Sequence, residues 1–159
     1  MSFTDWLLAL HVLAAATLVA AQVIFTIVVV GVRNLDRPSD VVRIFRLSRP
    51  GDVLVAIGSI GTLVLGVWLA IDIGDYDLWD AWIVVALVLW AVLMEVGRRT
   101  GKVFYAARDH AAELAAGGRD DPSPELNAML RTRTGVLLQG ASIVLVAALL
   151  VVMIYKPGA

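Results

Sequence analysis

Four long apolar runs constrain the fold of this chain more than any other feature. A helix needs roughly 20 mostly apolar residues to cross the hydrocarbon core of a bilayer. In lipid, such segments usually form helices, because a helix pairs the backbone N–H and C=O groups within the segment itself. The sequence therefore predicts an all-α integral membrane protein, a four-transmembrane-helix bundle that forms a single domain over residues 1–159, with spans at about 6–32, 53–71, 78–97 and 134–155.

The composition agrees with lipid as the solvent. Hydrophobic residues make up 60% of the chain and the mean hydropathy is +0.84, whereas soluble proteins are about 45–50% apolar. The first run carries Asp5 before it and is longer than the apolar region of a secretory signal, so we expect a retained span.

The chain contains no cysteine, which excludes disulfides, thiolate metal centres and cysteine nucleophiles. It has no phosphate-binding loop and no zinc-ligand spacing, and nothing identifies it as an enzyme. The expected partner is the lipid bilayer, with a symmetric homodimer as an alternative, and no nucleic acid is expected.

The charged residues lie mainly between the spans. The connection between the second and third spans is acidic, with Asp72, Asp75, Asp77 and Asp80. Basic side chains fill the other two connections: Arg33, Arg37, Arg43, Arg46 and Arg49 in one, and Arg98, Arg99, Lys102, Arg108, Arg119, Arg131 and Arg133 in the other. The positive-inside rule therefore predicts a multi-pass protein of the plasma (inner) membrane, with basic loops in the cytoplasm and both termini extracytoplasmic, N-out/C-out.

Both basic connections contain segments that favour helix. Apolar and arginine residues alternate over residues 40–49, which fits either an interfacial helix or a solvated linker. Residues 98–117 are rich in helix formers and should extend the third span into the cytoplasm. Ser123 followed by Pro124 is typical of a helix start, from which the fourth span would begin.

Two further patterns lie near the ends of the spans. Glu95 precedes Arg98 and Arg99 by three and four residues, which predicts ion pairs on one helix face. Aromatic residues near the outer interface are expected to form a belt: Trp6, Tyr76, Trp79, Trp82 and Tyr155.

His11 and Gln22 are polar residues within an apolar span, and their presence there needs an explanation. They lie eleven positions apart in the first span, which places them on nearly the same helix face. Polar groups at this depth usually face the bundle interior. His11 is either a neutral imidazole bonded to a neighbouring helix, or an axial ligand of haem iron, another metal ligand or a proton site. His110 should lie on the opposite side of the membrane, exposed to solvent, and cannot join it.

Small residues share a face of the second span, notably Gly58, Thr62 and Gly66. Such a face lets a neighbouring helix approach closely, or leaves room for a flat ligand such as a porphyrin. In the fourth span, Gln139 would bond to Gln22 if the two side chains lie at the same depth.

The first span begins with Trp6, Ala9, Leu10 and His11. This W-x-x-A-L-H opening resembles that of the bacterial membrane-bound protoporphyrinogen oxidases, and the ending Tyr155–Lys156–Pro157–Gly158 is similar to theirs. The resemblance implies b-type haem on His11. Leu8 stands where the oxidases carry a lysine.

Another pattern extends over residues 46–51 and 66–70. It is similar to a four-span family of uncharacterised predicted integral membrane proteins, loosely related to the copper-resistance D-type membrane proteins. This family is the nearer match.

These observations give two hypotheses. The first is a small integral membrane protein that binds haem b for electron transfer or porphyrin handling, with His11 as axial ligand and Gln22, Gly58, Thr62 and Gly66 around the cofactor. The alternative is a non-enzymatic subunit or scaffold without a cofactor, which oligomerises through the face that contains Gly58 and Gly66.

Overall fold

The computed structural model describes residues 2–74 and 77–156, so predictions that involve Asp75, Tyr76, Pro157 and Gly158 fall outside the described residues. The described chain is helical and contains no strand. Its helices are α1 (Phe3–Val32), α2 (Pro38–Phe45), α3 (Ser48–Ile73), α4 (Ala81–Ala116), α5 (Pro124–Leu130) and α6 (Arg133–Tyr155).

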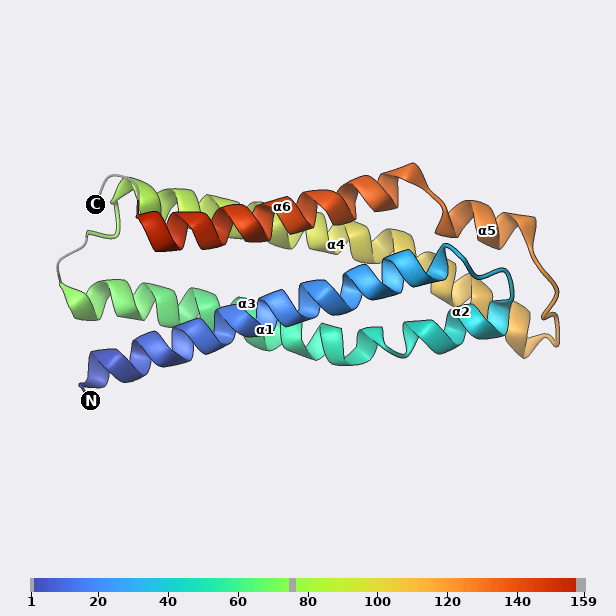
Figure 1. The fold of residues 1–159 in the computed structure, drawn as a ribbon, viewed down its shortest axis with the longest axis horizontal. Helices are drawn as coiled ribbons and strands as arrows, with labels where there is room; N and C mark the ends of the chain where they lie inside the picture. The colour runs from blue at the N-terminus through green and yellow to red at the C-terminus, as the bar shows by residue number, and fades with distance from the viewer. Residues whose placement is uncertain (1, 75–76, 157–159) are drawn as a thin grey trace.

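Four of these helices are long and apolar enough to cross a membrane, namely α1, α3, α4 and α6, and this confirms the predicted all-α, four-span class. α1 pairs with α3 and α4 pairs with α6, so the bundle consists of two antiparallel hairpins (Figure 1). A hydrogen bond of 2.7 Å from the Thr4 hydroxyl to the Asp72 carboxylate joins the start of α1 to the end of α3.

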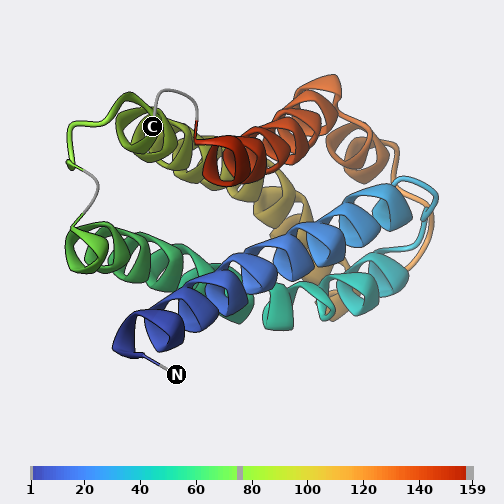
Figure 2. The ribbon, with the colours of Figure 1, turned by 60° about the vertical axis from the view of Figure 1, so that its left-hand side comes forward.

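The two ends of the bundle differ in content. α1 begins and α6 ends at one end, which we call the terminal end, whereas α2 and α5 lie at the opposite end (Figures 1 and 2). Both arginine-rich connections belong to this second end, which we call the basic end. The orientation of these ends in a membrane stays a prediction from the charge pattern.

Local sequence explains where several helices start and stop. At the start of α1, the Ser2 hydroxyl accepts a hydrogen bond from the Asp5 N–H and the Asp5 carboxylate accepts one from the Ser2 N–H, a reciprocal capping box. α3 ends at Gly74, whose φ of 71° is a left-handed conformation that glycine adopts without strain. The Ser123 hydroxyl accepts from the Leu126 N–H at 3.3 Å and so starts α5.

α5 is a separate helix and does not lead directly into the fourth span. It ends at Leu130, and α6 begins at Arg133 after a break. The predicted start at Ser123 is therefore confirmed, and α5 forms the helical turns expected ahead of the fourth span, although a break separates them from α6. In Figure 1, α5 lies beyond the start of α6 at the end of the bundle that also holds α2, and α6 runs back along α4.

α4 is longer than a bilayer is thick. Its 36 residues extend for about 54 Å, against about 30 Å of hydrocarbon. The predicted continuation of the third span over residues 98–117 is thus a continuous helix that projects beyond the membrane. Within α4, the Glu95 carboxylate pairs at 2.7 Å with both Arg98 and Arg99, as predicted.

A hydrophobic core lies at the basic end, which we call the helical cap. Val41 and Phe45 of α2 are 0% and 4% exposed there. They pack against the apolar stripe of the α4 projection, so residues 38–45 form a packed helix and the solvated-linker alternative is wrong for them, whereas a position at the membrane interface stays a prediction. The buried members are Val28, Val29, Val32, Val41, Phe45, Phe104, Ala107, Ala111, Leu114, Leu126 and Leu130.

Polar contacts join the two connecting segments that lie at the helical cap. The Asp120 carboxylate accepts hydrogen bonds of 2.9 Å from both the N–H and the hydroxyl of Ser39. The hydrogen bond from the Ser39 backbone has the larger effect and the one from its hydroxyl the smaller. Both favour the charged form of Asp120 and so hold its pKa below the usual value. The Arg131 guanidinium lies 3.6 Å from the Asp36 carboxylate.

His110 also belongs to this end of the bundle. Its ring is half-buried, with Nε2 3.8 Å from the Glu125 carboxylate of α5. The expected solvent-exposed histidine therefore faces a neighbouring helix. His110 lies far along α4 from the start of α1, so it does not meet His11.

Candidate functional site

Two cavities lie between the hairpins, and each has walls from α1, α3, α4 and α6. The terminal cavity, about 530 Å³, is lined among others by His11, Thr62, Gly66, Trp82 and Met153. The basic-end cavity, about 740 Å³, is lined among others by Gln22, Phe25, Arg98, Lys102 and Gln139. Both volumes fall in the range of about 300–1,000 Å³ that is usual for small-molecule sites.

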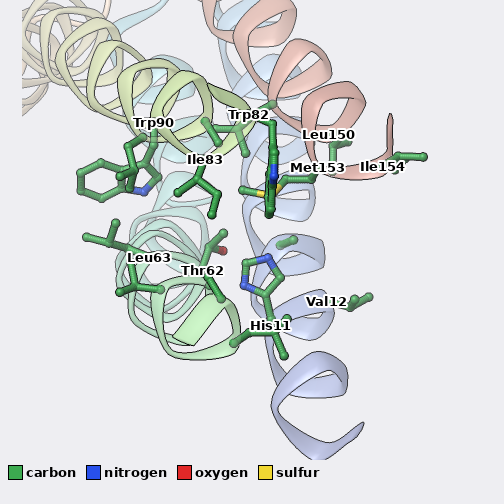
Figure 3. Close-up of a pocket in the computed structure, with 18 of the residues that line it drawn as sticks. His11, Val12, Thr62, Leu63, Trp82, Ile83, Trp90, Leu150, Met153 and Ile154 are labelled. Atoms are coloured by element: carbon green, nitrogen blue, oxygen red, sulfur yellow. The ribbon is translucent and has the colours of Figure 1, made fainter. Parts of the chain in front are cut away.

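His11 points into the terminal cavity. It belongs to the buried face of α1, which also carries Ala14 and Leu18, and is 9% exposed. Figure 3 shows its ring directed toward Trp82 and Met153, with one nitrogen on the Thr62 side and the other on the Trp82 side. The Thr62 backbone carbonyl is a polar neighbour of the ring. Among the described residues, the buried Nδ1 makes no hydrogen bond.

Gly66 makes the space that the His11 ring occupies. A Cβ atom at Gly66 would lie 2.8 Å from Cε1 and 3.2 Å from Nδ1 of His11, so any side chain there would force the ring to shift. The structure thus brings together three of the predicted site residues, His11, Thr62 and Gly66, on two helices that face each other.

Gly58 and Gln22 lie elsewhere. A Cβ at Gly58 would lie 2.8 Å from Leu18 Cγ and 2.9 Å from the Leu18 backbone nitrogen, so this glycine lets α1 and α3 approach closely. The small-residue face of α3 is therefore covered by α1 of the same chain, and we correct the expectation that it is an oligomerisation surface. Packing within one chain avoids the entropy cost of bringing two molecules together.

Gln22 lines the basic-end cavity, and its expected bond to Gln139 is not formed. The Gln139 side chain donates to the Thr26 hydroxyl at 3.0 Å, and that hydroxyl donates to the Gln22 backbone carbonyl at 2.7 Å. Gln139 thus contacts α1 one turn beyond the expected partner. The buried Nε2 of Gln22 has no partner in the described part of the chain.

Trp82 and Met153 are site residues that the sequence interpretation missed. Trp82 was expected in the outer aromatic belt, but it is 7% exposed and forms a wall of the terminal cavity, which corrects that expectation. Trp6, Trp79 and Tyr155 are exposed, as a belt requires. The spacing of Trp82 and the buried Ala86, one helical turn apart, is the signal that could have placed Trp82 inside.

Lys156 places a positive charge at this cavity. It is among the lining residues, and its Nζ lies 5.5 Å from the centre of the Trp82 ring. A cation at this distance from an aromatic face is attracted by it. The cavity therefore combines apolar walls, one imidazole, one thioether and one cation.

The two cavities share no lining residue. Between them, the Trp90 indole N–H donates to the Ser59 carbonyl at 3.3 Å and joins α4 to α3. Each cavity can therefore be considered as a separate site.

No cluster of three or more His, Cys, Asp or Glu side chains that could hold a metal ion occurs within residues 2–74 and 77–156. A metal held by protein side chains alone does not fit the terminal cavity. A metal inside a macrocycle needs only one or two axial ligands from the protein, and His11 and Met153 are of the right types.

The comparisons with known proteins agree with the architecture. A family model described as a predicted integral membrane protein (DUF2269) matches residues 5–157. No curated protein and no solved structure matches the chain.

Proposed function

The chain belongs to this family of predicted integral membrane proteins, and on that premise we propose that it binds haem b in the terminal cavity through His11. The observation that carries the proposal is the His11 imidazole, buried in α1 and directed into an apolar cavity of about 530 Å³. A neutral imidazole in apolar surroundings is a common axial ligand of haem iron.

The residues around His11 suit an iron ligand. Histidines that bind metals usually direct their second nitrogen toward a carbonyl or carboxylate, which fixes the tautomer. In this cavity one nitrogen lies on the Thr62 side, near the backbone carbonyl, and the other faces Trp82 and Met153 (Figure 3). In the proposed site the nitrogen on the Trp82 side is the ligand.

The remaining walls match the other parts of the cofactor. The Met153 thioether is a second axial ligand type, and Lys156 can bind a propionate carboxylate. When bound, haem would supply reversible one-electron chemistry. The protein residues would hold it, exclude water and set its potential, for electron transfer or porphyrin handling. The W-x-x-A-L-H opening, which resembles that of the protoporphyrinogen oxidases, is a further reason to propose this role for His11.

The absorption spectrum of the purified protein tests the proposal. Protein made with a haem supply should show a Soret band, and His11→Ala should abolish it. His110→Ala is the matched control and should keep the band, because His110 lies at the basic end beside Glu125. Met153→Leu should retain haem but alter the spectrum of the reduced form.

Two results would overturn the haem proposal: no band after reconstitution with haem, or a band that survives His11→Ala. A colourless protein would favour the alternative of a non-enzymatic membrane subunit without a cofactor. A homodimer would then have to use a surface other than the α1–α3 contact, since that contact is formed within the chain.

The topology in a plasma (inner) membrane is a further part of the proposal. The basic connections gather at one end of the bundle, which supports a cytoplasmic basic end and extracytoplasmic termini. The cysteine-free chain allows a direct test. In intact cells, a membrane-impermeant maleimide should label Ser2→Cys but not Ala128→Cys in α5, and the reverse pattern would refute this orientation.

A further inference from the structure

The basic-end cavity is a second site, independent of the haem proposal. We propose that it binds an anionic phospholipid, with the phosphate at Lys102 and Arg98 and an acyl chain inside the cavity. Pockets between spans that carry basic residues on the cytoplasmic side are typical sites for anionic headgroups.

The interior of this cavity suits an acyl chain. Its walls include Phe25, Leu93 and Val146, from three different spans. Its volume of about 740 Å³ lies within the range of small-molecule sites. The cavity lies between the two hairpins, so its occupant would come from the surrounding bilayer.

Arg98 and Lys102 lie at the depth of lipid headgroups. Arg98 follows the start of α4 at Ala81 by 17 positions (98 minus 81). This corresponds to about 26 Å along the helix, close to the thickness of the hydrocarbon core. Lys102 is one turn further along, and residues four apart share a helix face.

The charges at the cavity favour an anion. Asp109 is paired with the Arg108 guanidinium at 2.7 Å, and Asp52 accepts a hydrogen bond from the Tyr105 hydroxyl. Arg98 uses Nε and Nη2 for Glu95. Lys102 makes no hydrogen bond or ion pair among the described residues, so it is the lining charge without an internal partner.

Gln22 supplies a third point of contact. Its buried Nε2 carries two N–H donors and has no acceptor in the described part of the chain. Gln22 lines the same cavity as Lys102. An ester carbonyl of a phospholipid would satisfy this donor, which explains why an amide remains unpaired at membrane depth.

Thermal unfolding of the purified chain in detergent tests the proposal. Phosphatidylglycerol at about ten times its dissociation constant should raise the unfolding midpoint by about 3–6 °C. Phosphatidylcholine and phosphatidylethanolamine with the same acyl chains should give much smaller shifts.

Two pairs of variants locate the effect. Lys102→Gln should remove most of the shift, whereas Arg133→Gln, at an exposed arginine that does not line the cavity, should keep it. Gly97→Leu should also remove it by filling the cavity, because a Cβ at Gly97 meets no atom within 4 Å. Gly140→Leu is its control, since Gly140 has equal space but is not a lining residue.

The proposal is overturned if the zwitterionic lipids stabilise the protein as much as phosphatidylglycerol does. It is also overturned if Lys102→Gln and Gly97→Leu both keep the full shift, or if each control loses as much as its partner variant. None of these results depends on haem, because His11 lies in the other cavity.

Discussion

Replacement of Gly66 by alanine tests the contact on which the terminal cavity depends. The added Cβ would lie 2.8 Å from His11 Cε1, and the imidazole would have to move. Overpacking of this kind costs about 1–3 kcal/mol, and the gain of alanine over glycine in a helix offsets about 0.5–1 kcal/mol. The net loss of up to about 2.5 kcal/mol would lower the unfolding midpoint by up to about 10 °C for a chain of this size.

Thermal unfolding in detergent measures this loss, and Gly140→Ala is the matched control. A Cβ at Gly140 meets nothing within 4 Å, so the control should unfold at or slightly above the wild-type temperature. The clash is with the His11 ring, so Gly66→Ala should cost nothing in a His11→Ala background, which is a double-mutant cycle. The reasoning is refuted if Gly66→Ala matches its control, or if the cost is the same with and without the imidazole.

Three further changes probe other contacts. Phe45→Ala should lower the free energy of unfolding by about 3–5 kcal/mol, because its ring is buried in the helical cap; a loss under about 1 kcal/mol in a thermal melt would contradict this. Gln139→Leu should cost only about 0.6 kcal/mol, since Thr26 keeps its bond to Gln22, and a several-fold larger loss would argue for a wider network. The pKa of Asp120 is lowered in the folded protein. Its contribution to the free energy of unfolding is therefore complete above its usual pKa and is lost as the pH falls through the folded-state pKa. The advantage over Asp120→Asn should therefore be present at pH 7 and be lost in acid, below the usual pKa of an aspartate, and an advantage that persists once the carboxyl is protonated would exclude this cause.

The sequence predicted the parts of the fold that depend on local pattern. Uncharged apolar runs identified the spans, and the helix formers after Arg98 identified the projection of α4. Ser123 and Pro124 marked the start of α5 because capping depends on neighbouring residues alone. Helical periodicity within the second span also placed Thr62 and Gly66 on one face.

The partner of each face could not be predicted in this way. The apolar side of α2 has the same composition whether it meets lipid or the α4 projection. Trp82 near a span end is compatible with an interfacial belt and with a cavity wall. Met153 is an apolar residue in an apolar span and gives no local signal, while the contact of Gln139 with Thr26 depends on the axial offset of two helices.

The helical cap and the spans are stabilised in different solvents. The cap packs on a part of α4 that projects into water, where burial of apolar surface drives association and is weakened by urea and by cooling. The spans lie among lipid tails as apolar as the helices themselves, so close packing and polar contacts supply the attraction there. The two regions therefore differ in their response to urea. Urea should release α2 and α5 at concentrations that leave the spans helical.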